Sequence, residues 1–370
     1  MSKIDILRAW PQMFGWNTKR KLVIFESDDW GSIRMPNQKV FALLSAKGIL
    51  GDKTEISHYN KFDTLASKED FECLFDLLSS FKARNGKSPV FTALSLVANP
   101  DFQKIKESDF NDYVWEPLKV TLSRYGLDDA NDAMKEGEAK GVFIPEFHGR
   151  EHLNVGLWLQ LLKSGNSAVL AAFELECWTI KRDDKMRVQA AFNWYPGFNL
   201  DDQALVLAEG LAEFERQYGR RASFFVPPNG PFNSQLETGL NKRGLKYMGI
   251  SKLQLEPIHD QKYKKKLHYL GQRSKTGLIY LTRNAFFEPS QGGKDWTRSC
   301  LKEVDIAFKY RKPAVISTHR VNYVGGLSKE NRDKGLSELS NLIASILKQW
   351  PDVEFITSSQ LGDIIENKVS

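Results

Sequence analysis

Two histidines separated by three residues carry the sharpest chemical signal in this sequence. They are His148 and His152, at the ends of the run His-Gly-Arg-Glu-His. At positions i and i+4 of one helical turn, two imidazoles face the same way and can reach one metal ion. The pair directly follows an apolar run, Gly141–Phe147, which we expect to be a strand. The alternative is a pair of unconnected surface or capping histidines.

Two adjacent acids, Asp28 and Asp29, follow another apolar run, Leu22–Phe25. Beside a metal ion the two carboxylates can take separate roles, because one can complete the ligand set and the other can act as a general base. Alone, adjacent acids at a strand end are commonly solvated loop residues or helix caps. The hypothesis of a site therefore depends on whether the acids and the histidines lie close together.

Two further segments also follow predicted strands. His319 comes directly after Ala314–Thr318 and is a candidate general acid, if it lies across a pocket from the aspartates. The loop Pro-Pro-Asn-Gly-Pro follows Ala222–Val226, and a backbone N–H near Asn229 could point at an oxyanion. Separately, these segments also fit a structural histidine and a simple turn. In parallel α/β barrels the carboxyl ends of all strands open on one face, so we expect the four segments to converge.

The elements that must position these residues alternate along the chain. Short apolar runs indicate strands that are buried on both faces, as in parallel sheets. Longer amphipathic runs indicate helices between them. The expected strands are Leu22–Phe25, Val90–Ala98, Gly141–Phe147, Ala222–Val226, Leu278–Thr282, Ala314–Thr318 and Val353–Thr357. The expected helices include one from a cap at Asp201 or Asp202 through Tyr218, Asn233–Lys242, Asp295–Tyr310 and Ser328–Trp350.

This alternation predicts an α/β fold with parallel strands, either a barrel or an open doubly wound sheet. Two polar regions, at about 37–87 and 100–140, interrupt the alternation, and we interpret them as long, partly helical insertions between strands. No clean linker divides the chain. We therefore expect one barrel domain over residues 1–370, in which insertions form walls or lids of a site.

Composition excludes several classes of protein. The 370 residues are 41% hydrophobic and 26% charged, which is typical of a globular chain. The formal net charge is only +6 and the basic residues are scattered, so we expect no nucleic-acid partner. Three distant cysteines indicate no disulfide framework, and neither a signal peptide nor an apolar membrane span is evident. We therefore expect a cytoplasmic protein, whose oligomeric state the sequence does not determine.

The motifs, in this order, resemble those of the polysaccharide deacetylase family, the metal-dependent carbohydrate N- and O-deacetylases. That family has Asp-Asp after its first strand, His-x-x-x-His after its third, a proline-containing loop after a later strand and an apolar-x-His motif near the end. The segments that match are Ser27–Asp29, His148–His152, Val226–Gly230 and Ile316–His319. The resemblance covers most of the chain from about Lys21 to Ile365, with the two insertions outside it.

The resemblance implies an irregular (β/α) barrel of about seven strands, and a role for each residue. Asp29, His148 and His152 would bind a divalent metal, usually zinc, and Asp28 would be the base. Three protein ligands leave a position open for water, as in catalytic zinc sites. His319 would protonate the departing amine or alcohol, and the loop at Asn229 would stabilise the oxyanion. The implied partner is an acetylated saccharide.

The sequence also departs from the family pattern. Trp30 stands where the family usually has Gly after the second Asp, and we expect it to contact the sugar. Val226 stands at the place of the loop arginine that orients the base, for which Arg150 or Arg320 would substitute. Gly149 replaces the usual Ser or Thr.

Two other functions fit parts of the pattern. A barrel with a decayed catalytic site could still bind carbohydrate, and the missing loop arginine motivates that reading. The run His-Gly-Arg-Glu-His also matches H-x-x-E-H of inverzincin proteases, with Glu151 as the base. That motif lies inside a long helix, whereas here it follows a predicted strand.

Overall fold

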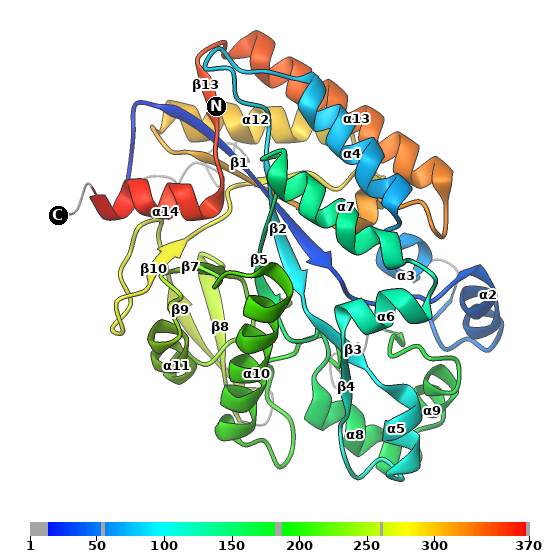
Figure 1. Cartoon of the computed structure of the whole chain (residues 1–370). Coiled ribbons are helices and arrows are strands. Elements are labelled where there is room, and N and C mark those ends of the chain that lie inside the picture. The colour runs from blue at the N-terminus through cyan, green and yellow to red at the C-terminus, as the bar shows by residue number, and fades with distance from the viewer. Residues whose placement is uncertain (1–13, 53–55, 182–186, 260–261, 368–370) are drawn as a thin grey trace.

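A parallel sheet forms the centre of the molecule. The computed structural model describes residues 14–52, 56–181, 187–259 and 262–367. Within them the sheet strands run in the order β10-β7-β6-β5-β2-β1-β12-β11, and β13 also pairs with β1 (Figure 1). Every pairing in this sheet is parallel. The strands are β1 (Lys21–Trp30), β2 (Phe91–Leu96), β5 (Phe143–Gly149), β6 (Phe224–Phe225), β7 (Tyr247–Gly249), β10 (Ile279–Leu281), β11 (Ala285–Phe286), β12 (Ala314–His319) and β13 (Val353–Phe355).

The two ends of this sheet lie close together, because they follow each other in the chain. Three residues join β10 to β11, and four residue steps span at most about 14 Å. The sheet is therefore curled, and neighbours in space are mostly neighbours in sequence, as in a (β/α) barrel. The predicted α/β barrel class is confirmed.

The predicted apolar runs lie within the strands of a sheet that is covered on both faces. Every residue of β1 after Lys21 is buried, and all six residues of β2 are buried. Parallel strands covered on both faces need apolar side chains at successive positions, which is the pattern of the sequence.

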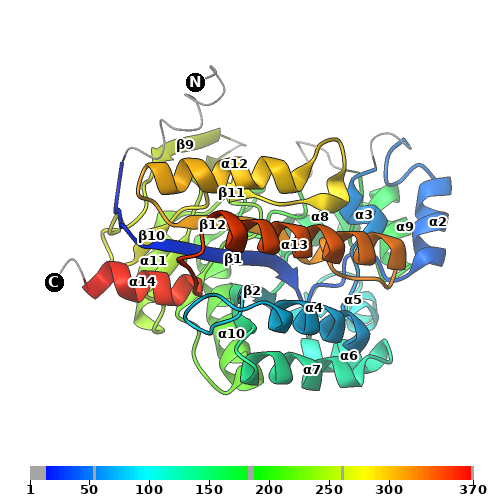
Figure 2. The same ribbon diagram turned by 90° about the horizontal axis from the view of Figure 1, so that it is seen from above.

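The helices pack around the outside of the sheet. Figure 2 shows α12, α13, α4 and α7 next to one another, and contacts join them in this order. The helices are α2 (Gln38–Ala46), α3 (His58–Phe62), α4 (Lys68–Ser80), α5 (Phe102–Glu107), α6 (Leu118–Arg124), α7 (Asp128–Ala139), α8 (Val155–Lys163), α9 (Ser167–Phe173), α10 (Leu200–Tyr218), α11 (Glu237–Lys242), α12 (Trp296–Lys309), α13 (Lys329–Gln349) and α14 (Ser358–Asn367). No helix in the described part of the chain is long and apolar enough to span a membrane.

Capping residues account for the ends of the long helices. Asp295 caps α12 and Ser328 caps α13, each accepting a backbone N–H in the first turn. Helix α10 is capped by Asn199, rather than by Asp201 or Asp202 as expected, and these two acids occupy its first turn.

Both polar regions contain one helix of the outer layer. Helix α4 lies between β1 and β2 along the chain, and α7 lies between β2 and β5. Side chains of both helices join the core cluster beneath β1. The remaining parts are additions at the end of the barrel where the chain leaves the strands. They include α2, α3, α5, α6 and the small antiparallel pair β3 (Ala98–Pro100) and β4 (Trp115–Pro117).

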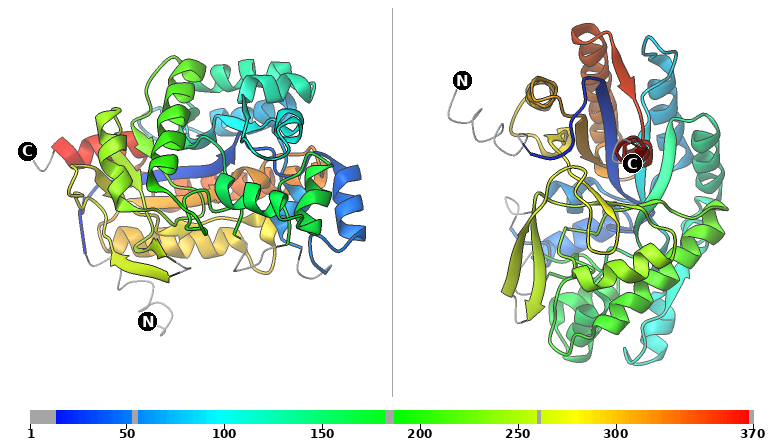
Figure 3. Two further views of the ribbon diagram at one scale, coloured as in Figure 1. Left: turned by 90° about the horizontal axis from the view of Figure 1, so that it is seen from below. Right: turned by 90° about the vertical axis from the view of Figure 1, so that its left-hand side faces the viewer.

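A second antiparallel pair, β8 (Leu253–His259) and β9 (Lys262–Leu267), follows β7. This hairpin extends along the side of the molecule (Figure 3, right, yellow-green). Neither strand was expected from the sequence.

Candidate active site

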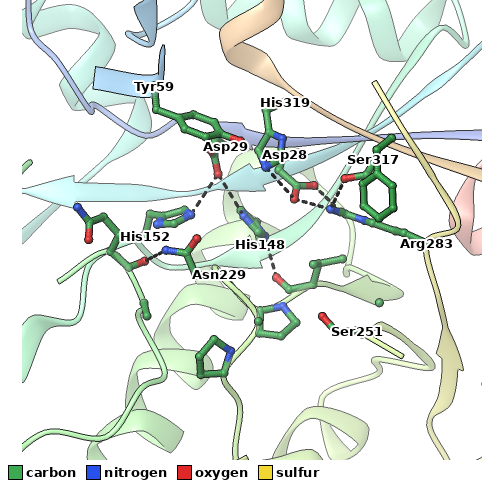
Figure 4. A pocket seen from close by; sticks show the side chains of 18 of the residues that line it. Asp28, Asp29, Tyr59, His148, His152, Asn229, Ser251, Arg283, Ser317 and His319 are labelled. Atoms are coloured by element: carbon green, nitrogen blue, oxygen red, sulfur yellow. Dashed lines mark hydrogen bonds and ion pairs between the residues drawn. The ribbon is translucent and has the colours of Figure 1, made fainter. Parts of the chain in front are cut away.

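A cavity of about 610 Å³ lies where the strands end. Six residues predicted to act together line it (Figure 4). They are Asp28, Asp29, His148, His152, Asn229 and His319. Residues that are 290 positions apart in the sequence thus meet in one pocket because parallel strands end on one side of the sheet.

The adjacent acids both face the cavity, which a regular strand does not allow. Successive side chains of a strand point to opposite faces. Here Asp29 has φ 73°, and the pairing of β1 with β2 shifts register between Ser27 and Trp30. A positive φ at a non-glycine residue costs about 1–2 kcal/mol, and such strain is typical of functional sites. The distortion turns both carboxylates to the same side.

The donor atoms of Asp29, His148 and His152 have the spacing of ligands to one metal ion. Oδ1 of Asp29 lies 3.4 Å from Nε2 of His148 and 3.2 Å from Nε2 of His152. All three donor atoms lie within 4.8 Å of one another, and all three residues are buried. Two ligands at zinc-like distances with a tetrahedral angle between them are about 3.4 Å apart. An N–H···O hydrogen bond would be shorter, at about 2.9 Å.

The hydrogen bond of His148 leaves its other ring nitrogen available as a metal ligand. Its Nδ1 lies 2.7 Å from the carbonyl oxygen of Val226, which can only accept, so Nδ1 carries a hydrogen. In a neutral imidazole Nε2 then has a lone pair, which faces a carboxylate oxygen of Asp29. A cation between these two atoms removes the repulsion. The Val226 carbonyl thus orients His148 as the outer partners of metal-binding histidines do.

The helical turn expected to align the two histidines does not exist. His148 lies on β5, His152 lies in the turn that follows, and α8 begins only at Val155. The reason is local: Gly149 has φ 124° and leads the chain out of the strand without a helix. The ring of His152 stacks at 6.3 Å on Trp178. Both imidazoles therefore lie close to Asp29 although they are not on one helical turn.

Electrostatics favour the charge states that metal binding needs. Burial raises the pKa of Asp29, but the two histidines outweigh it, and the pKa lies well below the usual range. Burial lowers the pKa of His152, and Asp29 offsets this only in part. An ionised carboxylate and a neutral imidazole are the ligand forms.

Arg283, which sequence reasoning missed, holds Asp28. Its two terminal nitrogens donate to both oxygens of Asp28 at 2.5 and 2.7 Å, and Nε donates to Glu26 at 2.6 Å. Burial raises the pKa of Asp28, but the guanidinium together with His148 and His319 outweighs it and the pKa is lowered. Arg283 follows the end of β10. Its position directly after the predicted strand Leu278–Thr282 was the available signal.

His319 faces Asp28, and a second acid, Glu288, favours its protonated form. Its Nε2 lies 3.7 Å from Oδ2 of Asp28, and its Nδ1 lies 2.5 Å from Glu288. Burial lowers the pKa of His319, but Glu288 and Asp28 outweigh it and raise the pKa to about 9. Glu288 is fixed by Asn322, whose amide donates to its second oxygen at 2.8 Å. His319 therefore carries a proton at neutral pH.

The loop after β6 forms the opposite wall. Asn229 has φ 56°, and its side-chain amide donates to the carbonyl of Gln189 at 3.0 Å. This hydrogen bond links the loop to the segment that contains Gln189. The Asn229 amide is therefore already occupied by a protein partner.

Three predicted residues lie outside the cavity. Trp30 is 2% exposed and packs against Phe71 and Phe143 in the core, because the register shift turns it away from Asp29. It does not contact the space where a sugar would bind.

The two arginines expected to replace the loop arginine are engaged elsewhere. Arg150 pairs with Glu151 at 2.6 Å, and its guanidinium lies over Tyr113. Arg320 is fully buried and pairs with Asp63 at 2.9 Å. Neither lines the cavity, so the expectation that one of them contacts Asp28 is wrong: the arginine that contacts Asp28 is Arg283.

Arg34, in the segment that follows β1, lies near the second carboxylate oxygen of Asp29. Its Nη2 lies 3.6 Å from Oδ2 of Asp29, and its Nε lies 3.3 Å from Asp63. The Tyr59 ring lies under the guanidinium at 5.0 Å and meets His319 edge-on at 5.2 Å. One polar region of the sequence thus provides a wall of the cavity.

Comparison with known proteins gives likenesses of structure alone. No model of a known family matches the sequence, and no curated protein matches it. A Mycobacterium smegmatis protein assigned as a polysaccharide deacetylase is 12% identical, with 96% of this chain and 93% of that chain covered and a TM-score of 0.46. Polysaccharide deacetylases are among the structural neighbours of this chain.

Two further neighbours carry similar assignments. A Pseudomonas aeruginosa protein assigned as a polysaccharide deacetylase is 10% identical, with 93% of this chain and 91% of that chain covered and a TM-score of 0.45. A peptidoglycan deacetylase of Bacillus subtilis is 9% identical, with 94% and 93% covered and a TM-score of 0.34. At such identities the likeness concerns the fold.

Proposed function

We propose that this protein is a metal-dependent hydrolase that removes acetyl groups from a sugar or polysaccharide. One observation carries the proposal: a buried Asp29-His148-His152 donor set borders a cavity that also holds an ionised acid, Asp28, and a protonated histidine, His319. A metal-dependent hydrolysis of an amide or ester uses these groups together, namely a metal site, a base and an acid.

The donor set fits zinc. One carboxylate and two imidazoles are ligands that zinc prefers, and three protein ligands leave a position open. A bound zinc ion would polarise the acetyl carbonyl and lower the pKa of a bound water toward 7. The chain itself supplies the rest of the chemistry.

Asp28 is the proposed base. Arg283 keeps this carboxylate ionised and fixes its plane, so that an oxygen stays directed toward the cavity. A proton taken from the attacking water would rest there. The position that the family pattern gives to a loop arginine is thus filled from another strand end, which removes the motive for a decayed catalytic site.

His319 is the proposed acid. Its raised pKa, about 9, means that it carries a proton at neutral pH and can give it to the departing amine or alcohol. Glu288 keeps the imidazole in place. A backbone N–H of the loop at Asn229 would stabilise the developing negative charge on the acetyl oxygen.

The geometry does not favour a protease of the H-x-x-E-H type. Glu151 is bound by Arg150 and by the hydroxyl of Tyr113, and it does not line the cavity. A base must reach the water that it activates.

Acetate release tests the proposal. Zinc-loaded protein is incubated with a panel of N- and O-acetylated sugars, and free acetate is measured against Asp28→Asn as a control. We expect release by the unsubstituted protein and a loss of about 10²–10⁴-fold in Asp28→Asn, the usual contribution of a general base. Folded, zinc-loaded protein that releases no acetate from any member of the panel would count against a deacetylase.

A further inference from the structure

Lys252 provides the cavity with a charge that the proposed reaction does not use. It lies just after β7 and lines the cavity, with its side chain half-buried. The backbone is fixed on both sides, since the Ile250 N–H donates to Leu281 at 2.9 Å and the Lys252 carbonyl accepts from His268 at 2.8 Å. The Lys252 side chain therefore starts from a fixed point of the cavity wall.

No acidic partner compensates this ammonium in the part of the chain that the structure describes. Three other cations of the cavity wall are paired: Arg283 with Asp28 and Glu26, Arg34 with Asp29 and Asp63, and His319 with Glu288. The Lys252 ammonium has no ion pair and no hydrogen bond with any residue that the structure describes.

The charged group that acts on Lys252 is a second cation, Lys312. Lys312 donates to the backbone carbonyls of Gly15 and Trp16, which are neutral. Burial lowers the pKa of Lys252, and Lys312 adds to this, so that it falls to about 8. A half-buried charge without a partner is costly, and an anion in the cavity would offset that cost.

Building on the proposed deacetylase function, we propose that the substrate is an acetylated saccharide that carries an anionic group, a carboxylate or a phosphate. Lys252 binds this group while the acetyl group lies at Asp29 and the histidines. A neutral sugar presents only hydroxyl groups, which pair with an ammonium more weakly than an anion does. The cavity of about 610 Å³ has room for a sugar with both groups.

The surroundings of Lys252 add to the positive potential. The hairpin that starts directly after Lys252 exposes Lys262, Lys264 and Lys265, none of which has an acidic partner among the described residues. Such a field concentrates anionic ligands at the mouth of a cleft and is weakened by salt.

Matched sugars and matched variants test the inference. Zinc-loaded protein is titrated calorimetrically with N-acetylglucosamine, N-acetylmuramic acid and N-acetylglucosamine 6-phosphate, and acetate release is followed in parallel. Lys252→Gln removes the cavity charge. Lys246→Gln removes the same charge from an exposed lysine outside the cavity and serves as the control.

We expect at least one anionic sugar to bind about tenfold or more tightly than the neutral sugar, an advantage typical of a charge-assisted contact. Lys252→Gln should remove that advantage and Lys246→Gln should keep it, while the preferred sugar identifies carboxylate or phosphate. Equal binding of all three sugars, or an advantage that survives Lys252→Gln, would overturn the inference. Acetate release from the neutral sugar would then leave the proposed function standing. Lys252-dependent anion binding without acetate release would instead support the anion site and contradict the deacetylase.

Discussion

Replacing Arg283 with methionine should both destabilise the protein and weaken its proposed base. The guanidinium donates to both oxygens of Asp28, to Glu26 and to the hydroxyl of Ser317. Methionine keeps much of the side-chain volume and removes all four hydrogen bonds. It leaves two carboxylates, 5% and 1% exposed, without their shared cation.

The size of the effect follows from this burial. Removing one partner of a buried ion pair costs about 3–5 kcal/mol of unfolding free energy. Without the guanidinium, burial becomes the dominant influence and raises the pKa of Asp28. Because the base must be ionised, the acidic limb of the pH profile of kcat/KM should move to higher pH.

Denaturant unfolding and a pH profile of acetate release measure the two effects. Arg150→Met is the matched control, because Arg150 is a buried, ion-paired arginine outside the cavity. It should lower stability but leave the acidic limb in place. In an Asp28→Asn background, Arg283→Met should cost less than it does in the unsubstituted protein. Equal shifts of the acidic limb in both arginine variants, or full additivity with Asp28→Asn, would refute the reasoning.

Two further predictions concern Glu288 and Trp30. Glu288→Gln removes the acid that raises the pKa of His319; activity that needs protonated His319 is lost as pH rises through its pKa, so the basic limb should fall from about 9 by about one unit or more. An unchanged basic limb would exclude His319 as the acid. Trp30→Ala should lower the unfolding free energy by about 3–5 kcal/mol, because Trp30 packs in the core. A higher KM at unchanged stability would instead restore its role in sugar contact.

Much of the barrel could be predicted because its strands are buried on both faces. The runs at Leu22–Phe25 and Ala314–Thr318 lie within β1 and β12, which pair directly. Strands β7 and β11 gave weaker signals, because they have three and two residues and, unlike the equally short β6, do not lie within a longer predicted run. Such lengths do not establish a periodicity.

The sequence identified candidate residues at strand ends, but it did not identify the contacts between distant strand ends. Asp28, His148 and His319 each directly follow or end an apolar run. Arg283 contacts Asp28 over 255 positions, and nothing in its local sequence identifies that partner. The expectation for Trp30 failed because the φ of 73° at Asp29 breaks the alternation of side chains.

Metal stoichiometry tests the central claim most directly. Tag-free protein is stripped with a chelator, reloaded with zinc, separated from free metal and analysed for zinc per chain. We predict one zinc ion in the unsubstituted protein and in His259→Ala, which replaces an exposed histidine of β8. The double variant His148→Ala/His152→Ala should lose the ion while remaining folded. Intact protein that binds no zinc, or a double variant that retains it, would contradict the account.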